Sequence, residues 1–200
     1  MGHREDLLVG AKRCLIEKGY ARTTTRDIVA ASGTNLASIG YHYGSKEALL
    51  NKALIDAVSD SASQLADAMT AGSDAAPMDQ FEAMWTRLIE QFATNKQLWL
   101  ASFEVFAQIG RVPSVRDALA DGIQQGREGM AQMFRGTAGE NTDEQALLAV
   151  GSFYQALATG IMAQWLVDPE RAPSGSDLAL AMRTIMDWQR TAEPEAQSAT

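Results

Sequence analysis

Two short segments with helical spacing of apolar residues lie next to each other near the start of the chain, at residues 25–32 and 36–43. They are separated by Gly33-Thr34-Asn35, and a three-residue turn containing glycine between two short helices is the helix-turn-helix pattern. Helices this short are not stable in isolation. We therefore expect both to pack against the helix before them and the start of the helix after them, in one small tri-helical unit.

The rest of the sequence also predicts helices. Val and Ile do not cluster, period-two alternation is absent, and helix-favouring Ala, Leu, Met, Gln and Glu dominate. We expect an all-α chain, with a loop at residues 71–77 and a flexible tail at residues 193–200. Further helices are expected up to Gly19 and over residues 45–69, 79–92, 96–109, 113–135, 142–168 and 176–192. Their expected N-terminal caps include Ser45, Asp79 with Glu82, Thr142 with Gln145, and Ser176.

Charge is distributed unevenly along the chain. The 200 residues carry a net charge of −8, but residues 1–50 hold seven Lys/Arg against five Asp/Glu, and residues 51–200 hold ten against twenty. The acidic average would argue against a nucleic-acid partner for the whole chain. A basic N-terminal region before an acidic body nevertheless permits nucleic-acid binding at one end.

Several other classes of protein are disfavoured. The single cysteine, Cys14, allows no internal disulfide and no CxxC site, and its apolar neighbours indicate a small buried side chain. The first residues are charged, so no signal peptide is expected, and no run of about 18 apolar residues indicates a membrane span. No His/Cys cluster suggests a metal site. We expect a soluble, cytoplasmic protein without a cofactor or a bound metal.

The helix over residues 36–43 is predicted to have two different faces. At 100° per residue, Ile39 and Tyr43 point inward, and Ala37, Ser38 and Tyr41 lie opposite, with His42 beside them. Small groups and one aromatic ring suit insertion into the major groove of DNA. Because this helix offers no Arg, Lys, Gln or Asn for bidentate base contacts, specificity would rest on small polar and apolar contacts and on DNA shape.

Residues that flank this helix are candidates for contacts with the DNA backbone. Asn35 is expected to cap the helix, which leaves its N-terminal amides free for phosphate. Lys46, at the start of the next helix, can neutralise a phosphate, and Thr25 and Arg26 can contact the backbone on the other side.

The sequence around the motif resembles the DNA-binding domain of a known family. Residues 23–49 read TTTRDIVAASGTNLASIGYHYGSKEAL, and YHYGSKEAL at 41–49 is the most diagnostic part. This segment is similar to the N-terminal domain of the TetR/AcrR family of bacterial transcriptional regulators. Thr34 and Gly40 depart from the family pattern, because many members have an aliphatic and an aromatic residue at these positions.

The resemblance implies a nine-helix subunit with two parts. Residues 1–46 would form the helix-turn-helix DNA-binding domain, and residues 47–192 a helical domain for ligand binding and dimerisation. Most members are repressors that bind palindromic operators as dimers and dissociate when a small molecule binds. The implied partners are double-stranded operator DNA, a small and largely apolar effector, and a second copy of the chain, but no membrane. The DNA-binding positions of the family fall on Thr25, Arg26, Asn35, Ala37, Ser38, Tyr41, His42 and Lys46.

Large apolar side chains in the middle of the chain are candidates for a ligand pocket, although the same residues would suit a plain core. They are Trp85, Phe92, Trp99, Phe103, Phe106, Met130, Met133 and Phe134.

The apolar helix after Thr142 carries two stripes. We expect one stripe, which includes Val150 and Phe153, to face the core of the subunit, and the other to face a partner across a two-fold axis; a helix wholly buried in a monomer is the competing interpretation. The residues expected at that dimer interface, together with two from the last helix, are Leu148, Ser152, Gln155, Thr159, Met162, Met182 and Ile185.

Two other classes of function compete with a regulator. A helical enzyme has little support, since no GxSxG, HExxH, P-loop or dinucleotide motif occurs and one of the two histidines lies in the helix-turn-helix motif. A module that binds only protein would suit the acidic body but would leave the basic N-terminal region unexplained. Salt-dependent binding to duplex DNA separates this alternative from a regulator.

Overall fold

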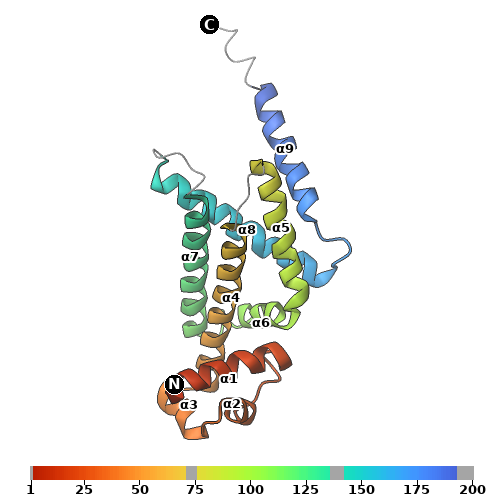
Figure 1. Ribbon diagram of the computed structural model, residues 1–200. Coiled ribbons are helices and arrows are strands. Elements are labelled where there is room, and N and C mark those ends of the chain that lie inside the picture. Colours follow the sequence, from red (N-terminus) through yellow and green to blue (C-terminus); the bar gives the residue numbers. More distant parts are fainter. Residues whose placement is uncertain (1, 71–75, 136–141, 193–200) are drawn as a thin grey trace.

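The computed structural model describes residues 2–70, 76–135 and 142–192, which form nine α-helices and no strand (Figure 1). This confirms the expected all-α fold. The predicted tail at 193–200 and most of the predicted loop at 71–77 lie outside the described residues. The helices are α1 (His3–Lys18), α2 (Thr25–Ser32), α3 (Leu36–Tyr43), α4 (Lys46–Thr70), α5 (Pro77–Thr94), α6 (Lys96–Phe106), α7 (Pro113–Arg135), α8 (Glu144–Val167) and α9 (Gly175–Ala192).

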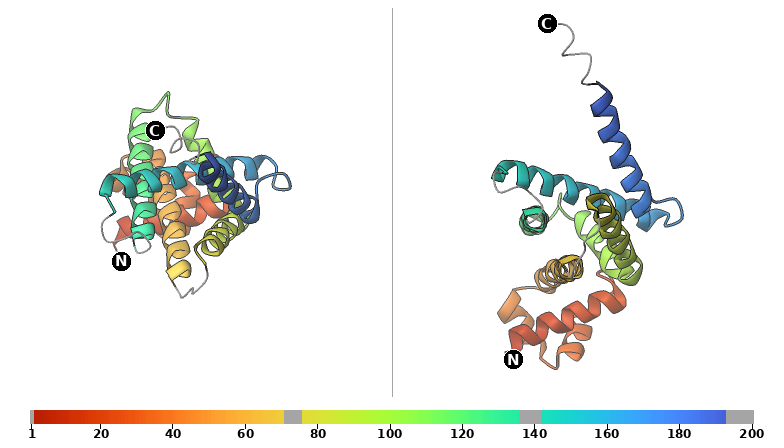
Figure 2. Two further views of the ribbon diagram at one scale, coloured as in Figure 1. Left: turned by 90° about the horizontal axis from the view of Figure 1, so that it is seen from above. Right: turned by 45° about the horizontal axis from the view of Figure 1, so that its top comes forward.

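The first three helices, which we call the head, gather at one end of the molecule, and α9 projects from the other end (Figures 1 and 2). Local sequence signals fix the ends of the head helices. Gly33 ends α2 with a φ of 67°, a left-handed conformation that favours glycine. The side chain of Asn35 caps α3 by accepting from the backbone N–H of Ser38 at 3.1 Å. Ser45 caps α4 in the same way, by accepting from the N–H of Ala48 at 3.0 Å.

Three predicted caps of later helices are wrong. α5 begins at Pro77, before Asp79, because proline at the first helical position needs no partner for a backbone N–H. α8 begins at Glu144 without a side-chain cap. The cap of α9 is Ser174 rather than Ser176, because Ser174 and Asp177 form a complete capping box: the Ser174 hydroxyl accepts from the N–H of Asp177 at 3.2 Å, and the Asp177 carboxylate accepts from the N–H of Ser174 at 2.9 Å.

The first hydrophobic core joins the head to α4, α6 and the start of α7. Leu7 and Leu15 of α1, Leu50 of α4 and Ala101 of α6 are fully buried in it. Cys14 also lies in this core, as predicted, and burial raises the pKa of its thiol. The head is therefore not an isolated unit, since its own apolar faces are completed by α4 and α6.

The second core lies in the C-terminal body, among α5, α6 and α8. Trp85 and Phe92 of α5 and Trp99 of α6 are its largest buried side chains. Val58 of α4 packs against both cores. α4 is thus the helix that connects the head with the body, as Figure 1 shows.

The orientation of α8 differs from the prediction. Gly151 faces α7 at the closest approach of the two helices, where a Cβ atom would overlap the backbone of Arg127 and Ala131. Because glycine has no side chain, the pattern of apolar residues did not mark Gly151 as a contact position. The predicted orientation of α8 was therefore rotated by part of a turn from the observed one. Val150 and Phe153, expected in the core, are exposed by 40% and 51%.

Two residues expected at the dimer interface instead contact other helices of the subunit, Met162 as a buried residue and Gln155 as a half-buried one. Met162 is buried in the second core, and the side chain of Gln155 lies against Gly126 of α7. Of the other five, Leu148 and Ile185 are exposed, whereas Ser152, Thr159 and Met182 are half-buried.

Among the described residues, α8 is the one helix long and apolar enough to cross a membrane by length and composition, with a mean hydropathy of 1.5 over its most apolar window. Core helices of soluble proteins pass the same test. Only 22% of that window is fully buried within the subunit, and many of its other residues are half-buried.

Candidate nucleic-acid interface

The start of α2 is held firmly against α1. Thr24 and Asp27 form a capping box, in which the Asp27 carboxylate accepts from the Thr24 N–H at 2.9 Å and the Thr24 hydroxyl accepts from the Asp27 N–H at 3.2 Å. Asp27 also pairs with Lys18 at the end of α1. Lys18, and then the hydrogen bonds from Thr24, hold the pKa of the Asp27 carboxyl well below its usual range. One side chain therefore fixes both the start of α2 and its angle to α1.

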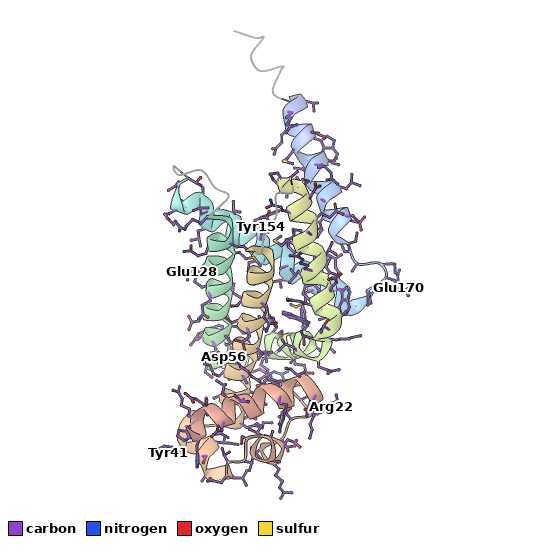
Figure 3. The ribbon with its side chains drawn as sticks, viewed as in Figure 1. Arg22, Tyr41, Asp56, Glu128, Tyr154 and Glu170 are labelled. Atoms are coloured by element: carbon purple, nitrogen blue, oxygen red, sulfur yellow. The ribbon has the colours of Figure 1, made fainter. Side chains whose placement is uncertain are left out.

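The outer face of α3 is small and apolar apart from one aromatic ring. Tyr41 is 86% exposed and Leu36 is 56% exposed, and Ala37 and Gly40 are exposed beside them. Figure 3 shows Tyr41 on the outer side of the head, away from the body. Ile39 is buried on the opposite side, as predicted.

Ser38 was predicted on this outer face, and the prediction is wrong. Its relative exposure is 8%, and its hydroxyl donates to the same Asn35 oxygen that caps the helix, at 3.2 Å. The exposed face is centred between Ala37 and Gly40 instead. Ser38 thus acts within the head and does not present its hydroxyl to an outside partner.

Two of the predicted contact residues are cations at the starts of α2 and α4. Arg26 is exposed and makes no ion pair with any residue that the structure describes. The Lys46 side chain is 27% exposed, with its Nζ 3.4 Å from the Thr23 carbonyl oxygen and 3.4 Å from Glu47 Oε1. Both partners are weak enough in geometry to be exchanged for a phosphate.

The remaining predicted contact residues lie at the start of α2 and at the two ends of α3. Asn35 is exposed at the start of α3, and Thr25 is half-buried at the start of α2. His42 is half-buried, with its ring 4.8 Å from that of Tyr41 in an edge-on arrangement. Arg22, an exposed residue in the turn before α2 that the sequence interpretation did not single out, donates from its Nε to the Lys18 carbonyl. Figure 3 labels it on the side of the head opposite Tyr41.

Five of the eight predicted pocket residues belong to the second core: Trp85, Phe92, Trp99, Phe103 and Met133. Phe92 and Trp99 are in edge-on contact, and Phe103 and Met133 pack against the same cluster. Phe106 contacts Phe103 at 6.1 Å between ring centroids. Met130 is half-buried on α7, and the side chain of Phe134 lies outside the described residues.

Three aromatic residues that pack in this cluster are absent from the predicted pocket: Phe81, Tyr154 and Trp165. Tyr154 stacks on Trp85 with 5.9 Å between ring centroids and 8° between planes, and lies at the centre of the body in Figure 3. Within the described part of the chain, no group of three or more His, Cys, Asp or Glu side chains could hold a metal ion.

Both the head and the body of this chain are similar to known protein families. The family model for bacterial regulatory proteins of the tetR family matches residues 7–53, and the model of the tetracyclin repressor-like C-terminal domain matches residues 76–188. The repressors AcnR of Corynebacterium efficiens and Corynebacterium glutamicum are each 41% identical over 46 residues, which cover 23% of this chain. The match spans about a quarter (24%) of the length of either relative.

Solved structures share the fold over nearly the whole chain. A TetR transcription regulator from Haloarcula marismortui has a TM-score of 0.58 at 18% identity, covering 93% of this chain and 95% of its own. The multidrug binding protein EbrR, solved with imidazole, has a TM-score of 0.64 at 20% identity over 92% and 94% of the two chains. A protein from Saccharomonospora viridis, solved with choline, has a TM-score of 0.56 at 22% identity over 92% and 95%. With both its head and its body matched by the family models, this chain belongs to the tetR family of bacterial regulatory proteins.

Proposed function

We propose that this protein is a dimeric transcriptional repressor that binds a palindromic operator and is released from it by a small, largely apolar effector. The observation that carries the DNA-binding part is the outer face of α3, on which Tyr41 projects beside small residues, with the exposed Arg26 and the half-buried Lys46 at the starts of the neighbouring helices α2 and α4. A major groove admits a helix of this kind, and cations at its rim contact phosphates. Membership of a family of regulators leaves no support for the enzyme alternative. The protein would act in the cytoplasm, where the chromosome is accessible.

Selection of bound sequences from random duplex DNA tests this function directly. An enriched palindrome supports the proposal, and the absence of any enriched sequence contradicts it. Repeating the selection with candidate apolar metabolites present tests release by an effector.

Removing one phosphate-binding cation should weaken operator binding in a recognisable way. We expect Arg26→Ala and Lys46→Ala each to lower affinity for specific and non-specific duplexes alike, and to reduce the slope of log K against log salt by about 0.9 per lost phosphate contact and subunit. Fluorescence anisotropy titrations over a range of salt concentrations measure both quantities. Arg171→Ala, which removes an equal charge from the loop between α8 and α9, is the control. An unchanged slope in Arg26→Ala and Lys46→Ala would contradict these contacts.

Gly40 offers a test in which stability and binding change in opposite directions. A Cβ atom at Gly40 meets nothing within 4 Å in the subunit. Gly40→Ala should therefore raise the free energy of unfolding by about 0.5–1 kcal/mol, as alanine does in a helix interior. The same methyl group lies on the face that approaches DNA, so we expect operator affinity to fall. Thermal unfolding and anisotropy titration give the two readouts, and a gain in both would place Gly40 outside the interface.

The exposed side of α8 supports the dimer. Ala149, Phe153, Ala156 and Gly160 follow each other at intervals of four, three and four residues, and all are exposed. Leu180, Ile185 and Trp188 add exposed apolar surface on α9. Two-fold pairing of α8 and α9 would bury this surface, and the small residues would let two copies of α8 approach closely. This face replaces the predicted interface at Gln155 and Met162, and it retains Leu148 and Ile185 at its edges.

The second core supports an effector site. Its residues are uncharged and rich in aromatic rings, which suits a largely apolar ligand. The indole Nε1 of Trp85 is buried and has no hydrogen-bond acceptor among the described residues. An unpaired buried donor costs about 1–3 kcal/mol, so a ligand with an acceptor group could gain by binding there. EbrR and the Saccharomonospora viridis protein were each solved with a small molecule, which is consistent with this role.

Release would follow from coupling between the two parts of the subunit. We assign residues 1–46 to DNA binding and residues 47–192 to ligand binding and dimerisation, with α4 as the connection. If the effector favours one separation of the heads and the operator another, each ligand weakens the other by the same factor. Effector affinity that stays constant at saturating operator would contradict this coupling.

A further inference from the structure

One face of α6 contacts the turn between α1 and α2. The residues of this face, Gln97, Ala101, Glu104 and Gln108, follow each other at intervals of four, three and four, which places them on one side of a helix. The last of them lies just beyond the end of α6. Contacts with the head run along the whole length of this face.

The contacts differ in kind from one position to the next. Gln97 Oε1 would lie 3.3 Å from a Cβ atom at Gly19, the residue that ends α1. Ala101 is fully buried in the first core, where its small side chain brings α6 close to α1 and α4. Glu104 Oε2 accepts a hydrogen bond from the backbone N–H of Ala21 at 2.9 Å.

A buried tyrosine completes this junction. Tyr20, next to Ala21, is 7% exposed, and its hydroxyl donates to Asn51 Oδ1 of α4 at 2.8 Å. Burial raises the pKa of the Tyr20 phenol, and a hydrogen bond with Gln108 acts in the opposite direction. Neighbouring residues of one turn are thus attached to two different helices of the body, Tyr20 to α4 and Ala21 to α6.

The Glu104 contact is suited to setting the angle of the head. A hydrogen bond from a backbone N–H to a carboxylate is charge-assisted and directional. Glu104 is an exposed residue, so removing its side chain leaves the Ala21 N–H accessible to water and does not create a buried unpaired donor. Loss of the bond should therefore cost the fold little, while it removes the hydrogen bond by which α6 holds the Ala21 amide.

Small changes in this angle would matter for a dimer on DNA. α4 has 25 residues, so at 1.5 Å per residue it is about 37 Å long. A tilt of about 5° over that length moves its end by about 3 Å, close to the 3.4 Å rise of one base pair. Half-site spacing is read by the separation of two such heads.

We propose that Glu104, by binding the Ala21 amide, is a positioning residue that sets the spacing between operator half-sites which this protein accepts. The proposal rests on the proposed function, because it needs two heads on one operator. Glu104 itself makes no contact with DNA in this arrangement. The base preference within each half-site is therefore set by α3 alone.

The experiment compares full-length variants on the operator selected by the wild type, and on versions with one or two base pairs added to or removed from the centre. We expect the wild type to bind the selected spacing at least tenfold tighter than its neighbours at one base pair. Glu104→Ala should reduce this discrimination to less than threefold while leaving the preferred half-site sequence unchanged. Glu104→Gln should retain the wild-type profile, since its amide oxygen can accept from the Ala21 N–H.

Glu90→Ala is the matched control, because it removes the same charge from an exposed position on α5. It should reproduce the wild-type spacing profile. Amide hydrogen exchange gives an independent readout: the Ala21 amide should exchange slowly in the wild type and in Glu104→Gln, and at least tenfold faster in Glu104→Ala.

The possible failures are distinguishable. If the wild type selects no operator, both the proposed function and the role of Glu104 are refuted. If an operator is found but Glu104→Ala keeps the wild-type spacing profile, the proposed function stands and the role of Glu104 is refuted. Equal exchange at Ala21 in all variants would also refute it.

Discussion

Gly151→Ala should destabilise the protein by about 2–3 kcal/mol, towards the upper end of what overpacking costs. A Cβ atom at this position would overlap the carbonyl oxygen of Arg127 and lie 2.8 Å from the backbone N of Ala131. Backbone atoms cannot rotate away as a flexible side chain can, so α7 and α8 would have to separate along their contact. For a chain of this size the loss corresponds to a fall in Tm of roughly 4–12 °C.

Gly129→Ala provides the matched control for this prediction. Gly129 lies on α7, where a Cβ atom would meet nothing within 4 Å. The same glycine-to-alanine change should there raise the free energy of unfolding by up to about 1 kcal/mol, through helix propensity alone. Denaturant titration measures both variants. Equal shifts in the two would mean that the close approach of α7 and α8 at Gly151 does not exist in solution.

Local features of the fold could be predicted from the sequence because their signals lie within a few residues. Gly33, Asn35 and Ser45 end or begin helices through bonds to their own neighbours, and all three were located correctly. The predicted cap at Ser176 failed for the same kind of reason, since two serines compete there and only Ser174 has an acid three residues later. That acid is visible in the sequence, so the correct cap could have been chosen from the capping-box spacing.

Features that depend on packing between helices could not be predicted. The burial of Ser38 follows from the angle at which α3 lies on the head, and a wheel diagram with eight residues leaves that angle uncertain. The face of α8 was misjudged because Gly151, the residue of closest contact, has no side chain to mark it. The bond between Glu104 and Ala21 joins residues 83 positions apart in the chain, so no local signal in the sequence indicates it.

Phe153→Glu should dissociate the proposed dimer and, as a consequence, abolish tight operator binding. Phe153 is 51% exposed in the subunit, so its replacement does not open the core. An aromatic anchor at an interface contributes about 1.5–2 kcal/mol or more, and in a two-fold interface it occurs twice. The expected cost of about 3–4 kcal/mol corresponds to a roughly 100- to 1,000-fold higher dissociation constant of the dimer. Two glutamates facing each other across the axis add repulsion. Sedimentation velocity over a range of protein concentrations measures the change.

Operator binding should fall with dimerisation because linked heads bind DNA far more tightly than separate ones, by about 100-fold or more. A monomer would retain only the affinity of one head for one half-site. Ile109→Glu is the control, since Ile109 is 46% exposed between α6 and α7 and receives the same new charge. It should remain dimeric and bind the operator with an affinity close to that of the wild type. Both variants leave α3 unchanged. A dimeric Phe153→Glu protein that still binds the operator tightly would therefore show that another surface holds the two heads together. The exposed face of α8 would then need a different explanation.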